Sequence, residues 1–168
     1  YAKAFTATEK YFKKFEKKHI LRVLIGGAGL FVLILFIPPL FGEGYGSIKL
    51  LSNLNTDLVF VRSPLSEGIL SKPVLYLLLL LAILLKPIAT AFTTASGGNG
   101  GNFAPSLFMG AFIGFLFSAL AGEIGIELPV SNFTIVAMAG ILSGIFHAPL
   151  TAIFLIAEIT GGYELIIP

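Results

Sequence analysis

The chain has 168 residues, of which 56% are hydrophobic and 12% charged, and its mean hydropathy is +0.94. Soluble domains are far more polar, so the composition predicts an all-α integral membrane protein that crosses the membrane several times. Cysteine is absent, and the histidines, His19 and His147, lack the spacing of metal ligands, so we expect no disulfide, no metal and no cofactor.

The first segment, Tyr1 to His19, is basic and aromatic. Tyr11, Phe12 and Phe15 recur at helical spacing between lysines, which predicts an amphipathic helix at a membrane surface. A basic cluster beside a membrane span is more often a topology determinant than a nucleic-acid site. We therefore expect no nucleic-acid partner. We place the protein in a bacterial inner membrane or other cell membrane, with this segment on the cytoplasmic side.

The first predicted span is Val23 to Phe41, which carries no charge and ends near Pro38 and Pro39. Its length suits a hydrocarbon core of about 30 Å. A glycine loop (42–46), a short helix (47–58) and a polar stretch (57–72) are expected to follow. The next span, Pro73 to Thr94, is apolar except for Lys86, and Pro87 is expected to bend or interrupt it.

Two further apolar stretches complete the pattern. Phe103 to Gly122 is predicted as a span with small residues four apart on one face, at Gly110, Gly114 and Ser118. The stretch 128–157 is too long for one straight span, and His147-Ala148-Pro149 is expected to divide it into two helices, the first with a second small-residue stripe (Gly140, Gly144 and Ala148). Thr160-Gly161-Gly162-Tyr163 is expected to close the second helix.

Between the two central spans, Ser96 to Pro105 reads S-G-G-N-G-G-N-F-A-P. Four glycines in the six positions 97–102 let the backbone turn its N–H groups toward one point, and Pro105 suits the first turn of a helix. A helix N-terminus behind such a loop favours an anion. A nucleotide-binding loop would need a preceding strand and a lysine, which are missing. The glycines could instead serve only close helix packing, and composition does not separate these two interpretations.

The motifs resemble those of the CLC chloride channels and chloride/proton antiporters. G-G-N-F-A-P (100–105) is similar to the family's G-x-F-x-P signature, and H-A-P-L-T-A-I-F-L-I-A-E-I-T (147–160) is similar to its R-A-P-L-T-x-x-x-L-x-x-E-x-T region. The two motifs stand in the family's order, about forty residues apart. The resemblance implies that 1–168 forms the second of two inverted-repeat halves of a CLC-type membrane domain, built from tilted, broken helices.

The resemblance also implies site residues. The anion-binding residues would be Gly100, Gly101, Asn102, Phe103, Ala104 and Pro105. The backbone N–H groups of Asn102 and Phe103 are the strongest candidates for direct donors to chloride, because such donors hold an ion without a full positive charge. Lys86 stands where the family commonly has a basic residue, which suggests a role in pathway electrostatics, although a snorkelling lysine fits equally.

Other positions are expected to be structural. Glu158 falls in a helix that resembles a dimer-interface helix, which implies a homodimer of the full-length protein. His147 replaces the more usual arginine and is expected to contact carbonyls at a helix end. The family's motifs G-S-G-I-P and G-[KR]-E-G-P are missing from 1–168, so we expect a piece of a longer polypeptide that neither conducts nor gates alone.

The expected function is chloride transport, as a channel or a chloride/proton antiporter. A transporter of another solute is the alternative, since broken helices could present carbonyls to a cation. Acidic residues near the loop would favour a cation, and none lies between Lys72 and Gly122. An enzyme would need a nucleophile, base or metal cluster, and the sequence offers no such set. Replacing Gly101 by Val is expected to weaken anion binding, and replacing Ser118 by Ala to do little.

Overall fold

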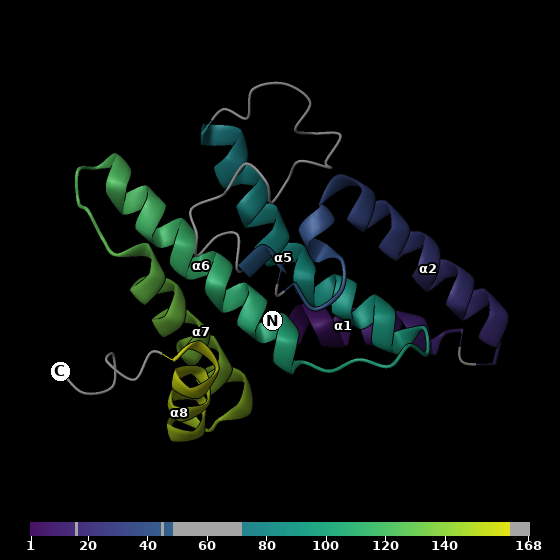
Figure 1. The fold of residues 1–168 in the computed structure, drawn as a ribbon. Coiled ribbons are helices and arrows are strands. Elements are labelled where there is room, and N and C mark those ends of the chain that lie inside the picture. The colour runs from purple at the N-terminus through teal and green to yellow at the C-terminus, as the bar shows by residue number, and fades with distance from the viewer. Residues whose placement is uncertain (16, 45, 49–71, 162–168) are drawn as a thin grey trace. The chain divides into compact units, whose positions relative to one another are not determined.

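A computed structural model describes residues 1–15, 17–44, 46–48 and 72–161. These residues form α-helices and one short 3₁₀ helix (Figure 1). The chain divides into two compact units: Tyr1–Gly44 with Asp57–Pro105, and Tyr45–Thr56 with Ser106–Pro168. The predicted helix 47–58 is helical over its first two residues, Ser47 and Ile48, and its remainder lies outside the described residues.

The first unit is organised around α5 (Lys72–Ala95), against which α1 (Ala2–Lys13) and α2 (His19–Phe36) both pack. Phe12, which is 2% exposed, contacts the ring of Phe92 with centroids 5.4 Å apart. The amphipathic first helix is confirmed, and its buried aromatic position packs on α5. Gly26 lets α2 approach the C-terminal end of α5 closely, since a Cβ there would overlap the side chain of Ser96.

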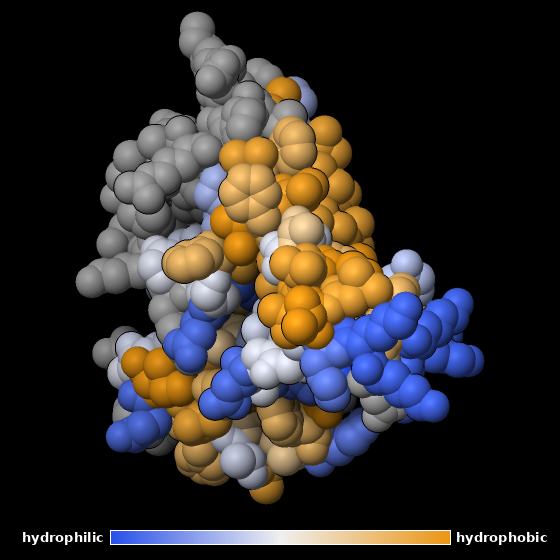
Figure 2. Space-filling model, turned by 90° about the vertical axis from the view of Figure 1, so that its right-hand side faces the viewer, coloured by the Kyte–Doolittle hydropathy of each residue, from blue (hydrophilic) through white to orange (hydrophobic). Residues whose placement is uncertain are grey.

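Helix α2 is the first of three helices that are long and apolar enough to cross a membrane, with α5 and α6 (Phe103–Glu123). It starts at His19, four residues before the predicted span, and ends before the two prolines, which form η1 (Pro38–Leu40). Most of α2 is exposed, including large apolar side chains such as Phe31. Figure 2 shows apolar side chains gathered beside strongly hydrophilic ones on one face of the molecule. An exposed apolar helix of this kind suits lipid.

Pro87 does not interrupt α5, contrary to one of the two predicted outcomes. The helix continues through it to Ala95. A proline inside a helix cannot donate the hydrogen bond to the carbonyl four residues earlier, here that of Ile83. Nearby hydroxyls bond to other carbonyls of α5, because Thr90 donates to Lys86 and Thr93 donates to Ala89.

In the second unit, α6 from Ser106 onward is followed by α7 (Val130–Phe146) and α8 (Pro149–Thr160). The small-residue stripe of α6 is confirmed as a packing surface. A Cβ at Gly110 would lie 2.5 Å from Cα of Met138, and one at Gly114 would overlap the carbonyl oxygen of Phe133. Ser118, also in this stripe, is 3% exposed and donates to the Leu128 carbonyl at 3.1 Å. Its hydroxyl therefore ties α6 to the segment that leads into α7, and the expected small effect of Ser118→Ala on anion binding stays a prediction.

The predicted break between α7 and α8 is confirmed at His147. This residue has a left-handed backbone with φ of 54°, and Pro149 begins the next helix. Gly161 ends α8 with φ of 67°, within the segment 160–163 that was predicted to close it, of which 162 and 163 lie outside the described residues. The second small-residue stripe behaves differently from the first: Gly140 and Gly144 are exposed, and a Cβ at either would meet no atom of the described residues within 4 Å.

Candidate functional site

The glycine loop begins as the C-terminal cap of α5. The Gly98 N–H donates to the Thr93 carbonyl at 2.9 Å, and the Gly97 N–H donates to the Thr94 carbonyl at 3.1 Å. Together with φ of 102° at Gly97, this pair of bonds is a Schellman motif, which satisfies carbonyls that a helix end leaves without partners. The first two glycines of the loop therefore end α5.

The space beside the glycines differs along the loop. A Cβ at Gly98 would lie 2.8 Å from the Thr93 carbonyl oxygen, and one at Gly100 would lie 3.3 Å from Cγ2 of Thr94. At Gly101 an added Cβ would meet no atom of the described residues within 4 Å. The four glycines thus divide into cap, close approach and open space, and Gly101 is the one beside open space.

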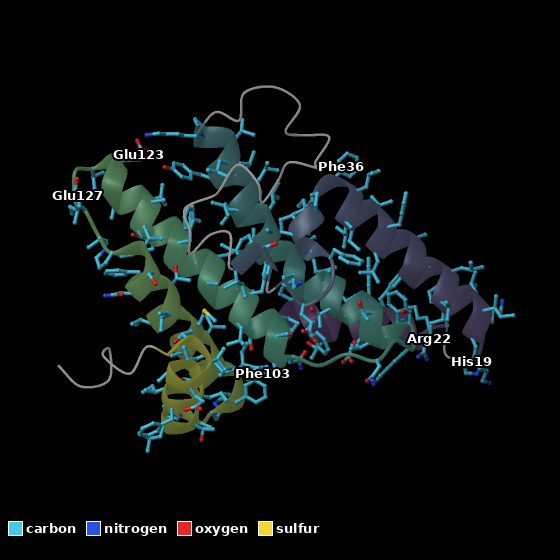
Figure 3. The ribbon with its side chains drawn as sticks, in the orientation of Figure 1. His19, Arg22, Phe36, Phe103, Glu123 and Glu127 are labelled. Carbon is cyan, nitrogen blue, oxygen red and sulfur yellow. The ribbon has the colours of Figure 1, made fainter. Side chains whose placement is uncertain are left out.

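Helix α6 begins two residues after Gly101. Phe103 is its first residue, as predicted, and Pro105 is its third (Figure 3). Gly100 and Gly101 are exposed, Asn102, Phe103 and Ala104 are half-buried, and Pro105 is buried. The first N–H groups of a helix have no intrahelical partner and carry the positive end of its dipole. The candidate loop therefore leads from exposed backbone into the N-terminus of a long apolar helix.

Asn102, the residue just before α6, is held by a distant residue. Its Oδ1 accepts a hydrogen bond from the Tyr1 hydroxyl at 2.8 Å, across 101 positions of sequence. Sequence reasoning did not single out Tyr1, because the tyrosine lies in a basic aromatic segment with no motif that links it to the loop. Burial raises the pKa of Tyr1 to about 12, an effect that the Thr90 hydroxyl partly offsets. The phenol is therefore a donor at neutral pH.

A positive charge lies at the start of this loop. Arg22 at the start of α2 reaches it, and the sequence carries no acidic residue between Lys72 and Gly122. A Cβ at Gly97 would lie 3.7 Å from an Nη atom of Arg22, whose position near the end of α5 is visible in Figure 3. A guanidinium here raises the local potential for an anion and disfavours a cation.

Lys86 lies apart from the loop contacts just described. Its side chain is 2% exposed, and its ammonium donates to the carbonyls of Leu40 at 3.2 Å and Gly42 at 2.9 Å. A snorkelling lysine would expose its ammonium, so this alternative does not describe Lys86. The side chain instead ties α5 to the end of η1 and the turn after it.

The remaining predicted positions lie in the second unit. Glu158 is an exposed residue of α8, next to the exposed apolar Ile159. His147 is exposed at the junction of α7 and α8. Both residues lie outside the glycine loop, and structural roles remain the expectation for them.

The three long apolar helices thus define a multi-pass, all-helical membrane protein. The family model described as "Voltage gated chloride channel" matches residues 1–168. The chain belongs to this family, the CLC chloride channels and chloride/proton exchangers, and is an integral membrane protein, as the sequence motifs predicted.

Individual relatives agree with this assignment. A putative chloride channel protein, ClcB-like, from Ralstonia nicotianae is 31% identical over 88% of this chain and 31% of its own length. The chloride channel protein CLC-e of Arabidopsis thaliana is 30% identical over 86% of this chain and 20% of its own. The H(+)/Cl(-) exchange transporter ClcA of Vibrio vulnificus is 30% identical over 99% of this chain and 33% of its own. The chain spans about a third or less of these relatives. No solved structure matches it.

Proposed function

We propose that this chain supplies one wall of a transmembrane chloride pathway, lined by backbone amides at the N-terminus of α6. It would form the second inverted-repeat half of the membrane domain in the complete protein. Gly100 to Pro105 would be the anion-binding segment, with the N–H groups of Asn102 and Phe103 as donors. The observation that carries the proposal is the exposed backbone at Gly101, where an added Cβ would meet no described atom within 4 Å, two residues before the positive end of a helix 21 residues long.

The electrostatics support an anion rather than a cation. Arg22 lies at one end of the loop, and the nearest acidic residue downstream in sequence is Glu123 at the far end of α6. Amide dipoles stabilise an ion that must also leave, because they lack the full charge that would hold it too tightly. The buried Lys86 of α5 would add to the positive potential from within the first unit.

The test is chloride efflux from liposomes that contain the protein expressed from its complete gene, with proton movement recorded at the same time. Gly101→Val should weaken chloride binding and slow efflux, because the added side chain restricts the backbone and occupies the open space. Gly27→Val is the matched control, since Gly27 is also exposed and also has no described atom within 4 Å of an added Cβ.

Each outcome has a separate meaning. Efflux with stoichiometric proton countermovement identifies an exchanger, and efflux without protons identifies a channel. Equal effects of the two valine substitutions would assign the loop to packing. A folded protein without anion flux would contradict the proposed function and favour a transporter of another solute.

A homodimer of the complete protein belongs to the same proposal. Helix α8 exposes Leu150, Phe154 and Ile159 on its surface, and Glu158 lies among them in sequence. A second copy would cover apolar side chains that otherwise face lipid. Crosslinking through a cysteine placed at Phe154, in a protein that has none in 1–168, should give a covalent dimer, whereas Phe31→Cys on α2 should not.

A further inference from the structure

Asn102 occupies the position from which a side chain ordinarily caps its own helix. An asparagine there accepts a hydrogen bond from the backbone N–H of the second or third helical residue. In α6 these residues are Ala104 and Pro105, and proline has no N–H. Ala104 is therefore the one partner that this cap could use, and its N–H belongs to the same first turn that the proposed anion site uses.

The structure shows the Asn102 oxygen engaged elsewhere. Oδ1 accepts from the Tyr1 hydroxyl at 2.8 Å, and Tyr1 is its hydrogen-bond donor within the part of the chain that the structure describes. We propose that Tyr1 is a positioning residue of the anion site, which holds the Asn102 carboxamide away from the Ala104 N–H and so keeps that N–H available to chloride. This inference rests on the proposed function and adds a residue to it.

The tyrosine is well placed for this role, because several contacts fix its position. Its ring stacks on that of Phe5, with centroids 6.0 Å apart and planes 11° from parallel. Further along α1, Phe12 is buried against Phe92 of α5, the helix that leads into the loop. The donor and the loop are thus attached to the same helix, and the hydrogen bond needs no flexible segment to bridge them.

The competing cap sets the size of the effect. Without the Tyr1 hydroxyl, Asn102 can rotate to cap Ala104, and an anion must then displace it. An asparagine cap contributes about 1 kcal/mol, which corresponds to roughly a fivefold change in a binding constant. Tyr1→Phe keeps the ring and its stacking on Phe5 but removes the donor. We therefore expect chloride affinity to fall about fivefold in Tyr1→Phe.

The experiment measures chloride binding by titration calorimetry on the complete protein in detergent, with efflux as a second readout. Tyr11→Phe is the matched control, since Tyr11 lies on the same helix and is 53% exposed. The decisive variant is the double mutant Tyr1→Phe, Asn102→Ala, which has neither the donor nor the competing carboxamide. Its affinity should equal that of Asn102→Ala alone and exceed that of Tyr1→Phe, because loss of the hydroxyl has no further effect once the competing carboxamide is gone.

A merely structural role of Tyr1 would give a different pattern. If the hydroxyl only stabilised the packing of α1, the double mutant would bind chloride as weakly as Tyr1→Phe or more weakly, and the inference would be overturned. Wild-type affinity in Tyr1→Phe would overturn it while leaving the proposed function intact. Absence of chloride binding in the folded wild type would overturn the proposed function and this inference together.

Discussion

Gly114 of α6 lies directly against the backbone of Phe133 in α7, so that a Cβ at Gly114 would overlap the Phe133 carbonyl oxygen. Backbone cannot move aside as a flexible side chain can. Gly114→Ala should therefore destabilise the protein by about 1–3 kcal/mol, the usual cost of overpacking. Thermal unfolding in detergent measures this change.

The control for that substitution is Gly140→Ala, in the middle of α7. Gly140 is exposed and an added Cβ would meet no described atom within 4 Å. Alanine is the better helix former by about 1 kcal/mol, so this variant should be neutral or slightly stabilised. A similar loss of stability in both variants would contradict the packing assigned to Gly114.

Ser118→Ala should lower stability by about 1 kcal/mol. The hydroxyl donates to the Leu128 carbonyl and is buried, so the substitution leaves that carbonyl with one partner fewer. Ser131→Ala is the control, because Ser131 is exposed on α7. The unfolding midpoints of the two variants should differ, and identical midpoints would show that the hydroxyl contributes nothing measurable.

Lys86→Met should destabilise the first unit by about 1–3 kcal/mol. The substitution removes the donor to the carbonyls of Leu40 and Gly42, and the buried Leu40 carbonyl then carries the cost of an unmade hydrogen bond. Lys3→Met removes an equal charge from an exposed position of α1 and should leave the unfolding temperature unchanged. Wild-type stability in Lys86→Met would show that the tie between α5 and η1 is dispensable.

The pKa of Tyr1 predicts a loss of stability in alkali. Burial raises it from the ordinary value of 10.0 to about 12, because tyrosinate is poorly solvated there. Between these pH values the unfolded chain loses the phenol proton while the folded chain keeps it. The contribution of Tyr1 to the free energy of unfolding is therefore present in full below pH 10 and declines as the pH approaches 12.

This alkaline decline is measured by unfolding at a series of pH values together with tyrosinate absorbance. The comparison is between the wild type and Tyr1→Phe, with Tyr11→Phe as the control, so that the contributions of all other groups cancel. The difference attributable to Tyr1 should vanish in the first variant and persist in the second. An unchanged profile in Tyr1→Phe would contradict the raised pKa.

Local sequence was enough to predict most helix boundaries. Phe103 begins α6 as expected, and His147-Ala148-Pro149 separates α7 from α8, because a left-handed residue ends one helix and a proline suits the first turn of the next. Pro87 was harder, since a proline within a packed helix is tolerated when the neighbouring elements hold it. The sequence pattern alone also treated the two glycine stripes alike, although among the described residues only the glycines of the α6 stripe lie against the backbone of another helix.

The sequence by itself determined that this is an all-helical membrane protein of the CLC family, because apolar length, helix breaks and short motifs are properties of contiguous residues. Only the tertiary structure decided how the loop is held. The Tyr1–Asn102 bond joins residues 101 positions apart, and the Lys86–Leu40 bond joins residues 46 apart. Which loop glycine caps α5, which allows a close approach and which lies beside open space also depends on neighbouring residues that come together only when the helices pack.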